Sequence, residues 1–157
     1  MGNKTLIYRQ KVEDNLKETQ KHLLRLDNAF MELKKYYAFP IDREDFDSLV
    51  KSNQQIAYSD QIIYRFSKLQ DSMGAKLFKS ILLYQGDNIN RPFLDILNSL
   101  EKMEIIDVDN WFELRDLRNE IAHDYDDNEN SAIYILNRIY ELKDELQNIL
   151  YVISKLL

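Results

Sequence analysis

Residues 130–157, NSAIYILNRIYELKDELQNILYVISKLL, decide the fold class. Apolar side chains return every three or four residues along this stretch, which is the spacing of one face of an α-helix. That face consists of Ile133, Leu136, Ile139, Tyr140, Leu142, Leu146, Ile149 and Leu150. The stretch therefore predicts a long amphipathic helix that must bury its apolar face against other helices.

The same periodicity recurs toward the N-terminus. Pro40 and the acidic segment 42–47 are expected to end the first helix and start a connection, and Gly74 marks a bend or break inside the second. Pro92 occupies a first-turn position of the third. The expected helices span residues 5–37, 45 or 48 to 84, 91–103, 110–124 and 130–157. We therefore predict five helices and no sheet.

The composition agrees with a helical bundle. The chain has 157 residues, 45% of them hydrophobic, and only three Gly and two Pro, which disfavours a turn-rich β fold. No internal repeat or flexible linker interrupts it. Long helices joined by short connections form antiparallel bundles. We expect residues 1–157 to form one all-α domain, an antiparallel up-down bundle with a four-helix core and an extra helix.

Cysteine, hydropathy and charge limit the class of function. The chain has no Cys, which excludes disulfides and thiolate metal sites. No signal peptide or membrane-spanning apolar run is present, so a cytoplasmic protein without membrane contact is expected. The net charge of −6 disfavours a broad nucleic-acid binder. Basic residues do gather on the first two predicted helices, and an acidic chain can still hold RNA in a local basic cleft.

Arg118 lies at an unusual place on the helix predicted over residues 110–124, for which Asp109 is a candidate N-cap. At about 100° per residue, Arg118 falls in the middle of an apolar arc. That arc consists of Trp111, Leu114, Leu117, Ile121 and Ala122. A buried arginine needs a partner. Asn119 and His123 are neighbours at the edge of the arc because they lie four residues apart.

The second predicted helix offers a partner. Asp60 falls inside its apolar stripe, near Ile56 in angle. Two helices that each place one charge of opposite sign in a buried stripe are expected to meet there. Asp60 would then hold Arg118 through charge-assisted hydrogen bonds. Arg118 could instead belong to a purely structural ion pair, and Asp60 could lie at a bundle end or in an open groove.

Residues 115–127, RDLRNEIAHDYDD, resemble the motif of the HEPN superfamily, which are small all-helical proteins that include many ribonucleases. The motif has an Arg, then a polar residue, then a His four to six residues beyond the Arg, here Arg118, Asn119 and His123. Tyr125, two residues after the His, narrows the resemblance to HEPN toxins paired with minimal nucleotidyltransferase antitoxins. The resemblance implies the same antiparallel bundle.

The resemblance also implies an activity, which is metal-independent endonucleolytic cleavage of RNA by 2′-OH attack. His123 would act as general acid or base. Arg118 would bind the scissile phosphate and stabilise the transition state, and Asn119 would orient the His or the phosphate. HEPN ribonucleases dimerise so that two motifs line one cleft, so a homodimer is implied. The antitoxin would regulate the toxin by attaching AMP to Tyr125, although the Tyr125 ring could instead simply cover the helix end.

Two other readings stay open. The chain could be a non-catalytic, substrate-binding helical partner of a nucleotidyltransferase, which the acidic surroundings of the motif favour, or a helical interaction module with no catalytic or nucleotide role.

Other candidate residues point to no further site. His22 has no companion ligand and is expected at the surface or half-buried. The acidic cluster Asp124, Asp126, Asp127 and Glu129 lacks the spacing and glycine of a calcium loop. We predict no cofactor and no metal site.

Overall fold

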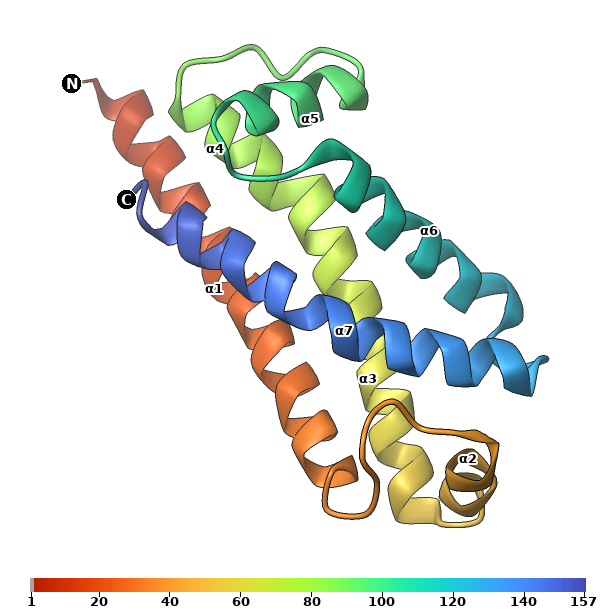
Figure 1. Cartoon of the computed structure of the whole chain (residues 1–157). Coiled ribbons are helices and arrows are strands. Elements are labelled where there is room, and N and C mark those ends of the chain that lie inside the picture. The colour runs from red at the N-terminus through yellow and green to blue at the C-terminus, as the bar shows by residue number, and fades with distance from the viewer. Residues whose placement is uncertain (1) are drawn as a thin grey trace.

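The computed structural model describes residues 2–157, with the side chain of Asp124 outside the described part. All regular structure in these residues is helical, without a strand, so the predicted all-α class is confirmed. The elements are α1 (Asn3–Leu33), α2 (Arg43–Val50), α3 (Asn53–Ser72), the π-helical turn η1 (Met73–Leu77), α4 (Phe78–Tyr84), α5 (Phe93–Lys102), α6 (Val108–Asp124) and α7 (Glu129–Ser154). Figure 1 shows them as a bundle.

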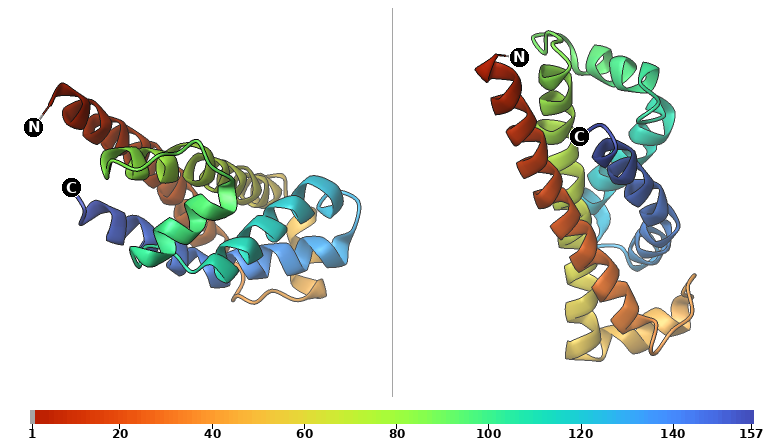
Figure 2. Two further views of the ribbon diagram at one scale, coloured as in Figure 1. Left: turned by 90° about the horizontal axis from the view of Figure 1, so that it is seen from above. Right: turned by 90° about the vertical axis from the view of Figure 1, so that its left-hand side faces the viewer.

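Four antiparallel segments form the centre of the bundle. The continuous rod α3–η1–α4 runs back along α1, and α7 runs back along α6 and packs on both α1 and α3. In both views of Figure 2 the α6–α7 pair lies on one side of the α1 and α3–α4 pair. The short helices α2 and α5 lie at opposite ends of the α3–α4 rod. This arrangement places α6 against α3, and the candidate site lies between these two helices.

The second predicted helix is two helices, so the prediction of five was wrong. Asp42 caps α2 by accepting a hydrogen bond from the Asp45 backbone, and the Asp45 side chain bonds back to the Asp42 backbone. Ser52 caps α3 by accepting from the backbone N–H of Gln55 at 3.2 Å. Each cap satisfies a backbone donor that a helix start leaves free. Two capping residues ten positions apart therefore start two helices, α2 and α3.

Three other helix ends differ from the prediction by a few residues. α1 ends at Leu33 rather than near residue 37, and α7 ends at Ser154. Asp107, not Asp109, is the N-cap of α6, because its carboxylate accepts from the backbone N–H of Asn110 at 3.0 Å. Asp109 lies in the first turn, where a negative charge is favourable beside the helix dipole.

The buried apolar side chains form one connected core. The predicted face of α7 is buried or packs against that core. Trp111 of α6 is 2% exposed and packs on Phe78 of α4, with 4.7 Å between ring centroids. Burying so large an aromatic side chain contributes strongly to stability. The packing fixes the N-terminal half of α6 against the rod at η1.

Candidate functional site

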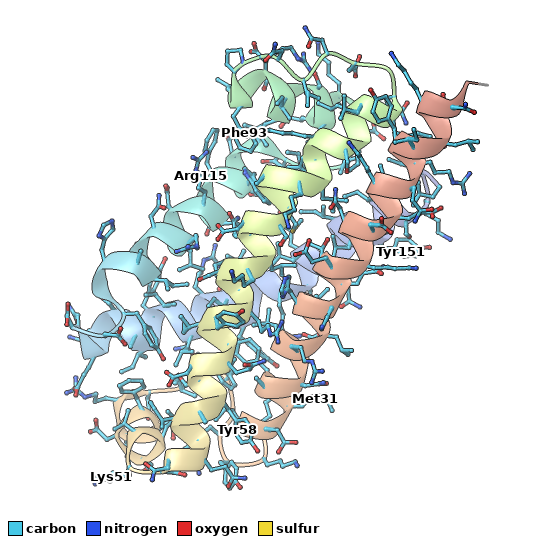
Figure 3. All side chains as sticks on the ribbon, turned by 180° about the vertical axis from the view of Figure 1, so that it is seen from behind. Met31, Lys51, Tyr58, Phe93, Arg115 and Tyr151 are labelled. Atoms are coloured by element: carbon cyan, nitrogen blue, oxygen red, sulfur yellow. The ribbon has the colours of Figure 1, made fainter. Side chains whose placement is uncertain are left out.

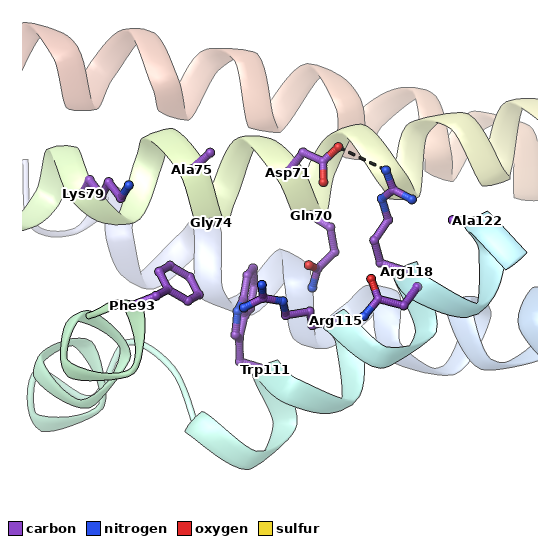
Figure 4. A pocket seen from close by; sticks show the side chains of 11 residues that line it. Gln70, Asp71, Gly74, Ala75, Lys79, Phe93, Trp111, Arg115, Arg118 and Ala122 are labelled. Atoms are coloured by element: carbon purple, nitrogen blue, oxygen red, sulfur yellow. Dashed lines mark hydrogen bonds and ion pairs between the residues drawn. The ribbon is translucent and has the colours of Figure 1, made fainter. Parts of the chain in front are cut away.

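A groove of about 690 Å³ lies between the α3–η1 segment and α6. Figure 4 shows the side chains that line it. The groove is lined by Gln70, Asp71, Gly74, Ala75, Lys79, Phe93, Trp111, Arg115, Arg118, Asn119 and Ala122. It thus contains two of the predicted site residues, Arg118 and Asn119, and three cationic side chains against one carboxylate. In a chain of net charge −6, this lining makes the groove a local basic site.

Arg118 is half-buried and reaches from α6 toward α3. Its side chain is 29% exposed, and its Nη2 donates to Oδ2 of Asp71 at 3.5 Å (dashed line in Figure 4). The predicted pairing with Asp60 is wrong, because the carboxylate that meets Arg118 is Asp71. Asp71 is 57% exposed, and the contact is long, so the pair is of the surface kind, worth ~0–1 kcal/mol.

The apolar arc of α6 is only partly covered, which explains the groove. Trp111, Leu114 and Leu117 are buried as predicted, but Ile121 is only partly buried and Ala122 is exposed. The C-terminal half of the arc is therefore less covered than the N-terminal half, and Ala122 lines the groove. Arg118 lies at the point where the arc changes from covered to open.

Three buried nitrogen donors of the groove residues have no hydrogen-bond partner in the described part of the chain. They are Nε2 of Gln70, Nε1 of Trp111 and Nε of Arg118. Gln70 and Trp111 are themselves 5% and 2% exposed. A buried donor without a partner costs about 1–3 kcal/mol. Three unpaired donors in one groove mark it as a candidate place for an acceptor from outside the chain, either an ordered water or a ligand atom.

His123 lies one helical turn beyond Asn119. Both side chains are exposed, and residues four apart on a helix are neighbours on one face. His123 does not line the groove. The structure therefore brings Arg118 and Asn119 together in one groove and leaves His123 beside the groove, at the C-terminal end of α6.

Tyr125 lies in a second pocket, of about 360 Å³, beyond the end of α6. The pocket is lined by Phe46, Val50, Ile56, Asp60, Tyr125, Asp126, Glu129 and Ala132. The Tyr125 hydroxyl shares a hydrogen bond with Oγ of buried Ser59. Burial, together with the charges of Asp60 and Asp126, raises the pKa of Tyr125 to about 12.

Tyr125 directly follows α6, as its C-cap residue. α6 continues to Asp124, and the Tyr125 ring packs against the core, covering the end of the helix. Asp60 is exposed at the same pocket. Partial burial of its carboxyl group, reinforced by Asp126, raises the pKa of Asp60.

His22 is buried, at 8% exposure, whereas a surface or half-buried position was expected for it. Its Nδ1 accepts from Nη1 of Arg65 at 3.0 Å. Burial, and then the charge of Arg65, lowers the pKa of His22. This histidine belongs to the packing of α1 on α3 and not to the groove.

Several groove residues were missed by sequence reasoning. Gln70, Asp71 and Lys79 come from the rod, and Phe93 comes from α5. Trp111, the only Trp of the chain, was recognised as part of the buried arc but not as a lining residue. In the described residues, no group of three or more His, Cys, Asp or Glu side chains is placed to hold a metal ion.

Comparisons with known protein families, with curated proteins and with solved structures gave no match for this chain. Within residues 2–157, every helix is too short or too polar to span a membrane.

Proposed function

We propose that this chain is a metal-independent endoribonuclease of the HEPN type, the toxin of a cytoplasmic pair with a nucleotidyltransferase antitoxin. The observation that carries the proposal is the basic groove around Arg118, in which cationic side chains and unpaired donors lie side by side. A phosphodiester supplies the negative charge and the acceptor oxygens that this lining lacks. The residues of the motif lie in the groove or one helical turn from it.

In the proposed reaction Arg118 binds the scissile phosphate. The ribose 2′-OH gives its proton to His123, and the 2′-oxygen attacks phosphorus. The bond from phosphorus to the 5′-oxygen breaks, and that oxygen takes up a proton from an acid. Arg118 stabilises the charge that develops on the phosphoryl oxygens, and Asn119 orients the phosphate. The products are a 2′,3′-cyclic phosphate and a free 5′-hydroxyl.

The acid is proposed to come from a second copy of the chain. A single His123 cannot act as base and acid in the same step, and the side chains of Asn119, Ala122 and His123 leave an exposed strip on α6. A two-fold homodimer that joins these strips would bring two histidines to one phosphate.

The antitoxin is proposed to act at Tyr125. AMP attached to the Tyr125 oxygen would place bulk and negative charge beyond His123 and hinder RNA entry. The hydroxyl must first leave Ser59, so modification requires a local opening of the α6 end.

The runner-up function is a non-catalytic partner that binds the substrate of a nucleotidyltransferase. The position of His123 outside the groove favours it, because the groove alone binds an anion without a group that titrates near neutrality. In this reading the groove would hold the phosphates of a nucleotide.

The test is cleavage of single-stranded RNA by the purified protein in the presence of EDTA. Arg118→Ala and His123→Ala should each reduce the rate by at least ~100-fold, the usual contribution of one acid–base group. Arg43→Ala is the matched control, because Arg43 is an exposed arginine of α2 that does not line the groove. Expression of the wild-type chain alone should stop growth, and His123→Ala should relieve this.

Two results would contradict the ribonuclease proposal. One is cleavage that EDTA abolishes, and the other is wild-type cleavage by both alanine variants. If the wild-type chain cleaves no RNA but binds nucleotides, and His123→Ala binds them equally well, the result supports the nucleotidyltransferase-partner function instead.

A further inference from the structure

The half of the groove away from Arg118 has a different character from the basic half. It lies where the π-helical turn η1 meets Trp111 of α6 and Phe93 of α5. Two aromatic rings and the glycine Gly74 form its walls. Nε1 of Trp111, a buried donor with no partner in the described residues, lies at this end. Gln70, whose buried Nε2 also has no partner there, lies between Trp111 and Arg118 (Figure 4). This half suits a flat group that carries hydrogen-bond acceptors.

Gly74 keeps this half of the groove open. A Cβ atom built on Gly74 would lie 3.4 Å from Cζ2 of Trp111 and 3.6 Å from Cζ of Phe93. A methyl group therefore just fits against the two rings, and any longer side chain at this position must enter the groove. Gly74 is the second residue of the π turn η1.

The two halves of the groove lie about two helical turns apart along α6. Trp111 and Arg118 are seven residues, or about 10 Å, apart along α6. Arg115 lies between them, and its Cζ stands 5.5 Å from the centre of the Phe93 ring. Figure 3 shows Phe93 and Arg115 at the same end of the molecule. Arg115 is exposed, so it can move outward and stack on a planar group that enters over the aromatic rings.

We propose that this half of the groove binds a nucleobase, next to the phosphate held at Arg118. The inference rests on the proposed function and refines its substrate: the groove takes a whole nucleotide unit, with an unstacked base, and not only the phosphate backbone. The base presents a carbonyl or ring-nitrogen acceptor to Nε1 of Trp111 and to the amide of Gln70. It stacks on the partly exposed ring of Phe93, as bases in single-stranded RNA do on aromatic side chains, while the buried Trp111 forms the floor below it.

The unique Trp111 provides a direct measurement. Its fluorescence reports on the groove without any label, because no other Trp contributes. Adenosine 5′-monophosphate and uridine 5′-monophosphate should quench it and bind at least about ten-fold more tightly than ribose 5-phosphate, the expected gain from stacking one base. Arg118→Ala should weaken the binding of all three compounds.

Variants of Gly74 test the base-binding half of the groove separately from the phosphate-binding half. Gly74→Met should abolish the preference for nucleotides over ribose 5-phosphate and leave the affinity for ribose 5-phosphate unchanged. Gly74→Ala, whose methyl fits, should keep the preference. Ala75→Trp is the second filling variant, at an exposed lining residue, for use if circular dichroism shows that Gly74→Met does not fold.

The outcomes distinguish this inference from the proposed function. Equal affinity for nucleotides and ribose 5-phosphate, or a nucleotide preference that survives both filling variants, overturns the base site and leaves the ribonuclease intact. A base-dependent affinity lost on filling the groove, in a protein that cleaves no RNA, supports the base site and removes the catalytic proposal.

Discussion

The two pockets beside α6 have opposite chemistry. The groove along its middle carries Lys79, Arg115 and Arg118 together with buried donors that have no partner in the described residues. The pocket at its C-terminal end carries three carboxylates, and the hydroxyl of its partly buried Tyr125 is hydrogen-bonded to Ser59. One helix thus separates a basic pocket with unmet hydrogen-bonding capacity from an acidic pocket whose buried hydroxyl is satisfied.

The difference indicates which pocket is prepared for a ligand. An unmet donor is a standing cost to the folded state, and a bound acceptor removes that cost. A satisfied hydroxyl gains nothing when a ligand enters. Charge acts in the same direction, because an anion is attracted to the first pocket and repelled by the second. The proposed anion site is therefore the groove and not the Tyr125 pocket.

The variant with the largest expected effect tests whether the wall of the groove is part of the hydrophobic core. Trp111→Ala should lower the free energy of unfolding by about 3–5 kcal/mol, because it removes a large side chain from a packed wall. Tyr134→Ala is the control, since Tyr134 is 53% exposed, and it should change stability by under ~0.5 kcal/mol. Urea unfolding followed by circular dichroism measures both. Similar losses for the two variants would mean that the groove wall is not part of the core.

A second variant tests whether the Tyr125 pocket is structural. Tyr125→Phe leaves the buried Ser59 hydroxyl without its partner and should cost about 1–3 kcal/mol. Adding Ser59→Ala should recover part of this loss, which a double-mutant cycle in urea measures. RNA cleavage by Tyr125→Phe should equal that of the wild type. A stable Tyr125→Phe variant that cleaves poorly would move function to this pocket.

The two aspartates of α3 should differ in their effect on anion binding. Asp71→Asn removes the carboxylate beside Arg118 and should raise the affinity for ribose 5-phosphate about two- to five-fold, in keeping with an exposed ion pair. Asp60→Asn should leave that affinity unchanged. The gain should shrink at high salt, where exposed charges are screened. An equal gain from both variants would show only a general charge effect.

The smallest expected effect is a pH dependence at the acidic pocket. The pKa of Asp60 is raised in the folded chain, so folding favours its protonated form. The resulting stability is present below the ordinary value of 3.8 and is lost as pH rises through the higher folded-state pKa. Asp60→Asn should therefore gain stability relative to the wild type across that window.

Asp126 tests the cause of this effect. Its charge contributes to the raised pKa of Asp60. Asp126→Asn should therefore lower the pKa of Asp60 and shorten the pH range over which stability is lost. The pKa should stay above its ordinary value, because partial burial of Asp60 remains. Urea unfolding over a pH series measures both variants. A wild-type advantage over Asp60→Asn that grows as pH rises would contradict the assigned direction.

The helices could be predicted from sequence, and the groove could not. Periodicity places a residue by its angle around a helix, and it put Arg118 on the side that faces α3. Asp60 and Asp71 are eleven residues apart, which at about 100° per residue leaves them about 20° apart in angle. They are also three turns, or about 16 Å, apart along the axis. Angle alone could not choose between them, because the axial offset of α6 on α3 comes from tertiary packing.

The same reasoning explains the other misses. The break between α2 and α3 depends on one local feature, the N-cap at Ser52. The apolar pattern continues across this position, so periodicity alone predicts one uninterrupted helix. The side-chain nitrogens of Gln70 and Trp111 have no hydrogen-bond partner because none of the described residues of the neighbouring helices places an acceptor near them. That depends on tertiary packing, which no local sequence pattern contains. The ribonuclease activity, the dimer and the modification of Tyr125 remain predictions.

The π turn also limits how this chain can change in length. In η1 the backbone N–H of Phe78 donates to the carbonyl of Met73, five residues earlier, so the turn holds one residue more than an α-helix would. Deleting a single residue there would restore a regular helix and rotate all of α4 by about 100° against α1. Phe78, Ile81 and Leu82 would then leave the core. In evolution or in engineering, the residues of the turn can be substituted one by one. A deletion would be tolerated only if the buried residues of α4 were replaced at the same time.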